Sequence, residues 1–335
     1  MKIFPLFLLL LLLTSMGSCK QSNQSSLDHI GVKQLMEDAE PEGLPLWTAD
    51  TIKKTNPELV LLMDTLYRYV RSENYPSINI SEKREWMGNY RKQLVAYYDR
   101  IHLGSDTINS FDKANTVIIT ADSLWAIDDD ISTMGMIING GTEYTRRQFQ
   151  EFNEFERIVS MSEPQEFTNA MEEEFSAWQD LQQQLENIVF CLNNIFYYGG
   201  SIVGVKNSAD YLAILNAHIN LYKCDYDILT YAPTTSLTYG VIPEGGKQLL
   251  QNCVNDLINE SYDCFDEYEG SDKDSLKSYY EKLVSANKNL SESLYNWIEA
   301  RKKVIGFATD YQSRGMNLNT GEFLVGLASI VSSIR

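Results

Sequence analysis

Residues 162 to 196 read SEPQEFTNAMEEEFSAWQDLQQQLENIVFCLNNIF, and this stretch decides the fold class. Ser162 and Gln165 match a capping box, and Pro164 suits the first turn of a helix. Apolar residues then recur at steps of three and four, which is typical of a helix face packed against a core. They are Phe167, Met171, Phe175, Trp178, Leu181, Leu185, Ile188, Leu192 and Ile195. The stretch predicts one helix of about 50 Å.

The same periodicity extends to both sides of this stretch. Helices are expected to start at Asn56-Pro57, at Ser81 and at Asn207-Ser208, where polar residues suit the cap position. Val117-Ile118-Ile119 is β-prone but lies inside a longer helical pattern, so we interpret it as helix. Residues 230–246, TYAPTTSLTYGVIPEGG, hold the turn formers of the longest loop.

The last long helix is predicted from about Lys273. Its apolar residues stand at strict intervals of seven: Leu276, Leu283, Leu290, Trp297 and Val304. Such spacing indicates a seam between helices in a bundle. The fold class predicted from the whole pattern is all-α, a bundle of long antiparallel helices.

Two segments indicate an internal repeat. NSADYLAIL from Asn207 and NTGEFLVGL from Asn319 share an Asn, a hydroxyl, an acid, an aromatic residue and two leucines. Each follows a long helix that carries a tryptophan, Trp178 or Trp297, and a turn that contains glycine. In the first copy the turn is Gly199-Gly200-Ser201, whose glycines are expected to adopt positive φ.

A third copy is predicted earlier in the chain. Trp125 lies in an expected helix, and Gly140-Gly141-Thr142 would form the corresponding turn before the next helix. The predicted unit is therefore a long helix, a Gly-rich turn and a second helix, present two or three times. One such unit cannot bury its apolar face alone, so the units are expected to pack together.

These features resemble the lysozyme-inhibitor (LprI-like) family of exported bacterial proteins. Trp297 and Arg301 match the family's tryptophan with an arginine four residues on, and Gly199-Gly200-Ser201 matches its turn. Gln182 replaces the arginine after Trp178, and the cysteine common in the family is Glu186 in one copy and Ile305 in the other. The resemblance implies an exported helical protein that interacts with lysozyme-type enzymes.

The N-terminus resembles a bacterial lipoprotein signal. Lys2 precedes an apolar run from Ile3 to Leu13, which is too short to span a membrane, and small residues lead to Cys19. Cys19 is the expected site of lipid attachment, acylated after cleavage; the alternative is an ordinary cleaved signal with Cys19 free. The lipid would anchor the chain in the cell envelope. Surface lipoproteins often carry acidic residues just after this cysteine. Because none directly follows Cys19, the periplasm is favoured over the cell surface.

The expected organisation has five parts. Residues 1–18 are the signal peptide, and residues 19–55 are a tether with an N-terminal extension. Residues 56–160 form a helical region with the first candidate repeat. Residues 161–246 hold the second repeat and its loop, and residues 247–335 the C-terminal repeat.

Four cysteines remain once Cys19 is assigned, and an even number in an exported chain suggests two disulfides. Cys253 and Cys264 lie eleven residues apart on one predicted helix, about 16 Å along its axis, so they cannot pair with each other. If the flanking helices form a hairpin across the 230–246 loop, Cys224 faces Cys253. We predict Cys224–Cys253 and Cys191–Cys264.

The chain is acidic, with a formal net charge of −18 that becomes −19 when Lys2 is removed with the signal. A basic nucleic-acid-binding surface is therefore not expected. Glu172-Glu173-Glu174 and residues 263–267 are acidic runs, which predict either solvated helix faces or a docking surface for a basic protein such as a lysozyme.

No motif for catalysis, metal or cofactor binding is recognisable. The histidines are scattered, as His29, His102 and His218, and none has a second ligand at zinc spacing. Asp128-Asp129-Asp130 would point in different directions on a helix. We therefore expect a non-enzymatic, protein-binding envelope lipoprotein without metal or cofactor; the alternative is a structural or assembly component of the envelope with no inhibitory role.

Overall fold

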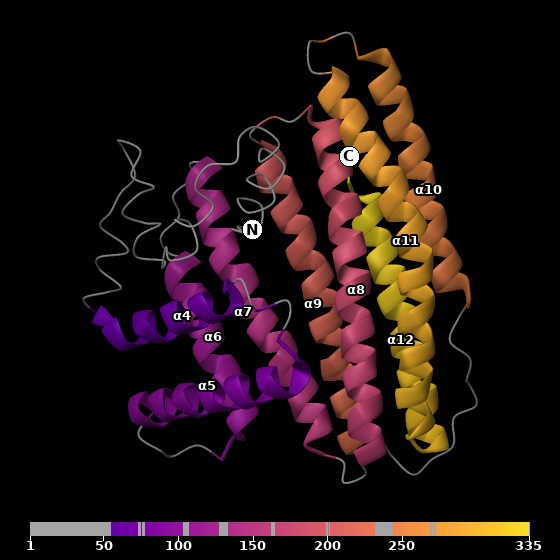
Figure 1. Cartoon of the computed structure of the whole chain (residues 1–335). Coiled ribbons are helices and arrows are strands. Elements are labelled where there is room, and N and C mark those ends of the chain that lie inside the picture. Colours follow the sequence, from indigo (N-terminus) through magenta and orange to yellow (C-terminus); the bar gives the residue numbers. More distant parts are fainter. Residues whose placement is uncertain are drawn as a thin grey trace. The chain divides into compact units, whose positions relative to one another are not determined.

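The computed structural model describes residues 55–72, 75, 78–102, 107–126, 133–161, 165–198, 200, 202–231, 244–268, 270 and 273–334. Within these ranges the chain forms nine helices and no strand, which confirms the all-α prediction (Figure 1). It divides into two compact units, Met1–Asn153 and Glu154–Arg335, and the division falls inside helix α7. The predicted signal peptide, the tether, Cys19 and His29 lie outside the described residues.

The first unit contains α4 (Pro57–Val70), α5 (Ile80–Ile101), α6 (Ser110–Ala126) and most of α7 (Thr133–Val159). Helix α4 begins at Pro57, as predicted. Helix α5 begins one residue before Ser81, because Asn79 is the cap, and its side chain accepts a hydrogen bond from the Glu82 N–H at 3.0 Å. Residues 117–119 lie in α6, so the helical interpretation of this β-prone run is confirmed.

The turn predicted at Gly140-Gly141-Thr142 is wrong, because these residues lie inside α7. Both glycines are buried, and the helix continues through them. A glycine inside a helix costs about 1 kcal/mol, which the burial of neighbours such as Tyr144 and Phe149 can offset. The Gly-Gly pair therefore does not mark a third helix–turn–helix copy. Trp125 lies in α6 as expected, but its side chain is outside the described part.

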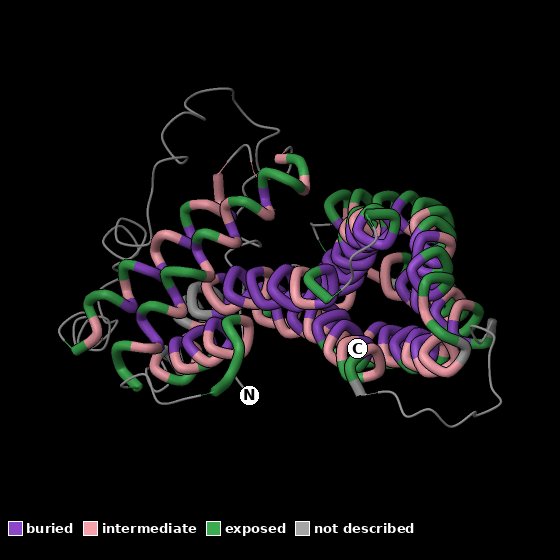
Figure 2. Tube along the Cα trace, turned by 90° about the horizontal axis from the view of Figure 1, so that it is seen from below, coloured by how far each residue is buried: buried purple, intermediate pink, exposed green. Residues whose placement is uncertain are grey.

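The second unit contains α8 (Gln165–Phe196), α9 (Ile202–Tyr231), α10 (Glu244–Glu267), α11 (Lys273–Gly306) and α12 (Asp310–Ser332). Helices α8 and α11 share the most extensive contact, α9 packs against α12 and α8, and α10 packs against α12 and α11. Figure 2 shows that the buried faces of these helices are turned toward one another. All five residues of the predicted seven-residue spacing in α11 are buried: Leu276, Leu283, Leu290, Trp297 and Val304.

The boundary between α8 and α9 differs from the prediction. Helix α9 begins at Ile202, so Asn207 and Ser208 are not a cap but fully buried residues inside the helix. The turn after α8 places Tyr198 in the left-handed region at φ 51°, whereas Gly200 does not adopt positive φ. Gly199 and Ser201 lie outside the described residues.

The predicted disulfides do not form, because Cys191, Cys224, Cys253 and Cys264 are all free. The pairing assumed that α9 and α10 form a hairpin, but α10 packs against α12 and α11 instead. Cys191 faces α11: burial raises the pKa of its thiol to about 12, while the charge of Lys282 on α11 lowers it. Cys224 is exposed on α9.

Candidate functional site: a buried polar cluster in the C-terminal unit

Polar side chains from four helices meet in the interior of the second unit. Seven of them have no exposed surface. We call the following residues the central polar cluster: Glu174 of α8, His218, Tyr222 and Asp225 of α9, Trp297 and Arg301 of α11, and Asn319 and Thr320 of α12.

Glu174 is held by side chains of two other helices. The indole N–H of Trp297 donates to its Oε1 at 2.7 Å, and the Tyr222 hydroxyl donates to its Oε2 at 2.6 Å. His218 Nε2 lies 3.8 Å from Oε1. Both oxygens of a fully buried carboxylate are therefore engaged, which is the condition for keeping such a group inside a protein.

The electrostatics keep Glu174 charged. Burial alone would raise the pKa of this carboxyl, but the nearby His218, the charge of Arg301 and the hydrogen bond from Tyr222 outweigh it. The pKa of Glu174 therefore lies below its ordinary value.

Arg301 connects α11 to α9 and α12. Its Nη2 forms an ion pair with Asp225 Oδ2, and its Nε donates to Thr320 Oγ1 at 3.1 Å. Asn319 Nδ2 donates to the other Asp225 oxygen at 3.3 Å. Burial lowers the pKa of Arg301, yet the charges of Asp225 and Glu174 raise it above the ordinary value, so the guanidinium keeps its charge.

Aromatic rings enclose the cluster. Trp178 stacks on His218, with ring centroids 4.0 Å apart at 17°. The two tryptophans on which the repeat prediction rests, Trp178 and Trp297, meet edge to face at 6.4 Å, and Phe323 contacts both. Because Trp178 and Trp297 have no exposed surface, they shield the charges from solvent.

The sequence placed Glu174 on a solvated or docking face, which is wrong. Its spacing contained the signal: residue 174 lies three positions after Met171 and four before Trp178, on the same apolar face of α8. Glu173, one position away, is exposed and pairs with Lys303 at the surface. Asp225 and Tyr222 were missed because their partners lie on helices distant in sequence.

A second polar group, near the end of α8, consists of two amides and one carboxyl. Asn193 Nδ2 donates to Asn207 Oδ1 and to Asp210 Oδ2, each at 2.9 Å. Burial raises the pKa of Asp210 to about 6, against the lowering effect of the Asn193 hydrogen bond and the Lys206 charge. We call Asn193, Asn207 and Asp210 the amide cluster.

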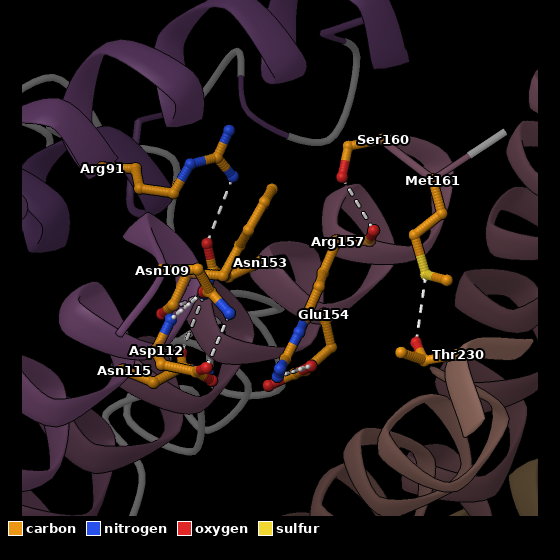
Figure 3. A network of polar contacts seen from close by, with 11 residues as sticks. Arg91, Asn109, Asp112, Asn115, Asn153, Glu154, Arg157, Ser160, Met161 and Thr230 are labelled. Carbon is orange, nitrogen blue, oxygen red and sulfur yellow. Dashed lines mark hydrogen bonds and ion pairs between the residues drawn. The ribbon is translucent and has the colours of Figure 1, made fainter. Parts of the chain in front are cut away.

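The first unit has its own polar network, drawn in Figure 3. Asn153 donates to Asn115 Oδ1 at 3.0 Å and to the Phe111 carbonyl at 3.1 Å, and it accepts from Arg91 at 3.2 Å. These contacts join α5, α6 and α7. A hollow of about 630 Å³ along α5 is lined by residues of both charges, including Arg84, Glu85 and Lys92.

The remaining candidate residues do not assemble a reactive site. His102 stacks on Tyr98 and hydrogen-bonds to its carbonyl at 3.2 Å, at the exposed end of α5. Asp128-Asp129-Asp130 lie outside the described residues. In the described ranges, no three His, Cys, Asp or Glu side chains are grouped so that they could hold a metal ion. None of the described helices has the length and apolar character needed to cross a membrane.

The charged residues of the central polar cluster pair with one another and with neighbouring polar side chains of the same unit. Its fully buried members cannot meet a substrate in this conformation, and what they do is bind α8, α9, α11 and α12 together. Comparison with known proteins finds no match to any protein-family model, any curated protein or any solved structure.

Proposed function

We propose that this protein is a non-enzymatic cell-envelope lipoprotein that binds another protein through its acidic surface, with a basic lysozyme-type enzyme as the first candidate partner. Its lipid would be carried by Cys19, and the two helical units would face the periplasm. The proposal combines the signal-like N-terminus with the distribution of charge over the described residues.

The main support for the proposal is that the polar groups of the second unit fall into two sets, one buried and one exposed. The members of the central polar cluster with no exposed surface are unavailable to a ligand. The outer faces carry a surplus of acids, among them Asp180, Asp256, Asp263, Asp266 and Glu322, which are all exposed. With a net charge of −18 over the whole chain, long-range attraction favours a basic protein over an acidic one.

The binding part of the proposal is tested with the full-length chain in neutral detergent micelles. We expect it to bind a basic lysozyme, to slow cell-wall hydrolysis by that enzyme, and to lose affinity as ionic strength rises from 0.05 to about 0.5 M. An acidic protein of similar size serves as control and should not bind. If lysozyme is neither bound nor inhibited, the inhibitor proposal is wrong.

The anchoring part is tested separately. Mass spectrometry of the protein isolated from a bacterial host should find the mature N-terminus at Cys19 with acyl chains attached. The Cys19→Ser variant should be recovered without lipid in the soluble fraction. An unacylated wild-type N-terminus would contradict the lipoprotein assignment without affecting the binding test.

A further inference from the structure

Acidic residues dominate most of helix α10 and the segment that follows it. Residues 248–272 contain seven Asp and Glu residues and no Lys or Arg. The helix packs against α12 and α11 through buried residues such as Leu250, Val254 and Leu257 (Figure 1). Among its acids, Asp256, Asp263 and Asp266 are exposed. Within the described residues, no ion pair joins Asp263 or Asp266 to a cation.

Aromatic rings stand beside these acids. Tyr262 of α10 is 46% exposed, and its ring centroid lies 5.5 Å from Tyr280 of α11 and 6.3 Å from Phe265. Phe265 and Tyr280 stack at 6.0 Å with an interplanar angle of 10°. Tyrosine and phenylalanine are enriched in protein interfaces. Here one exposed ring, Tyr262, lies against two partly buried rings, Phe265 and Tyr280, and is not an isolated surface residue.

One cation of the chain, Lys273, already contacts this surface. Lys273 Nζ lies 5.5 Å from the centroid of the Phe265 ring and donates to the Asp266 carbonyl at 3.0 Å. A ring face and a backbone oxygen therefore already hold one ammonium group here. The exposed ring of Tyr262 and the exposed carboxylates of Asp263 and Asp266 offer a further ring face and anionic acceptors to a second cation.

We propose that Tyr262, Phe265 and Tyr280, together with Asp263 and Asp266, form a docking surface for an arginine-bearing segment of a basic protein partner. This inference rests on the proposed function and locates its binding surface. Arginine fits better than lysine, because a planar guanidinium can stack on a tyrosine ring while it donates two hydrogen bonds to a carboxylate.

The test uses the full-length chain in detergent micelles, with synthetic octa-arginine and octa-lysine as probes and calorimetry as the readout. Octa-arginine should bind more tightly than octa-lysine. The Asp263→Asn/Asp266→Asn variant should weaken octa-arginine binding about fivefold, as expected for two exposed charge pairs. Tyr262→Ser should weaken it about threefold and reduce the preference for arginine.

Matched controls exist elsewhere in the same unit. Asp227→Asn/Glu322→Gln removes two exposed acids that both lie near Cys224, with the same change in net charge. Tyr295→Ser removes a tyrosine that is 53% exposed and has Lys247 5.5 Å from its ring. Both controls should change octa-arginine affinity by less than about twofold.

Equal weakening by the test and control variants would overturn the docking surface in favour of a diffuse charge effect, and so would no weakening by either. A lysozyme used as a second probe separates the two proposals. If lysozyme fails to bind while octa-arginine depends on Asp263 and Asp266, the docking surface stands and the lysozyme partner is wrong. If lysozyme binds with equal affinity to all variants, the proposed function stands and the docking surface is wrong.

Discussion

The two hairpins of the second unit, α8–α9 and α11–α12, share a local sequence pattern but use it differently. Four positions after its tryptophan, α8 carries Gln182, which donates to Glu186 of the same helix at 2.8 Å. The corresponding residue of α11 is Arg301, which reaches Asp225 on α9 and Thr320 on α12. The neutral Gln182 makes a contact within its own helix. The charged Arg301, at the corresponding position, links three helices.

The helices that follow match more closely. Ser208 and Thr320 are both fully buried, and each donates to the carbonyl four residues earlier, at 2.9 and 2.7 Å. The preceding asparagines differ: Asn207 accepts from Asn193, whereas Asn319 donates to Asp225. The same spacing thus gives the two hydroxyls the same bond to the backbone. The partners of the two asparagines differ, and only Asn319 contacts a buried charge. The duplication of these hairpins stays a prediction.

The largest expected effect comes from Arg301 of the α11–α12 hairpin. Arg301→Met removes the cation that faces Asp225 and leaves a buried carboxylate uncompensated, so the free energy of unfolding should fall by about 3–5 kcal/mol. Urea unfolding followed by circular dichroism measures it. The control is Lys302→Met, whose exposed pair with Glu299 should contribute less than about 0.5 kcal/mol. Similar losses in both variants would mean that the buried pair contributes no more to stability than the exposed pair.

Glu174→Gln tests the other charge of the central polar cluster. The amide keeps one acceptor oxygen but cannot serve both Trp297 and Tyr222, so we expect a loss of about 2–3 kcal/mol in the free energy of unfolding. Glu173→Gln, next to it but exposed, should be nearly neutral. Equal stability of the two variants in urea would contradict the buried role of Glu174.

Asp210 should make the amide cluster sensitive to pH. Its folded-state pKa of about 6 lies above the ordinary value of 3.8, so the folded state holds the proton more tightly. Stability from this group is present at low pH and is lost as pH rises from about 4 to 6. Asp210→Asn removes the titrating group and should be more stable than the wild type by about 3 kcal/mol at pH 8, and equal at pH 4. Melting curves across this range measure the difference, and one that does not vary with pH would refute it.

The smallest effect compares the matched hydroxyls. Thr320→Val leaves the Nε of Arg301 without its acceptor and should cost about 1 kcal/mol in the free energy of unfolding. Ser208→Ala removes only the bond to the Gly204 carbonyl and should cost less. If Ser208→Ala proves the more damaging change in urea, the bond from Arg301 does not make Thr320 the more important of the two hydroxyls.

The helices were largely predictable because their signal is local. The apolar spacing of residues 167–195 and the seven-residue spacing from Leu276 to Val304 both correspond to buried faces of single long helices. The errors occurred where one short residue pattern is found in more than one kind of structure. Gly140-Gly141 reads as a turn, and Asn207-Ser208 reads as a cap, yet both pairs are buried inside helices. Trp297, Arg301 and the Asn319 segment stood out in the sequence only as motif residues, and nothing local showed that they meet Glu174 and Asp225.

The sequence by itself determined that this chain is helical, which faces of the long helices are apolar, and that its net charge is strongly negative. These properties follow from the order of neighbouring residues and from composition. Only the tertiary structure decided that Asp225 is interior, that Arg301 pairs with a residue 76 positions away, and that the four cysteines stay apart. The physical reason is that burial and pairing of charge depend on which helices become neighbours, and that choice is made by packing over the whole unit.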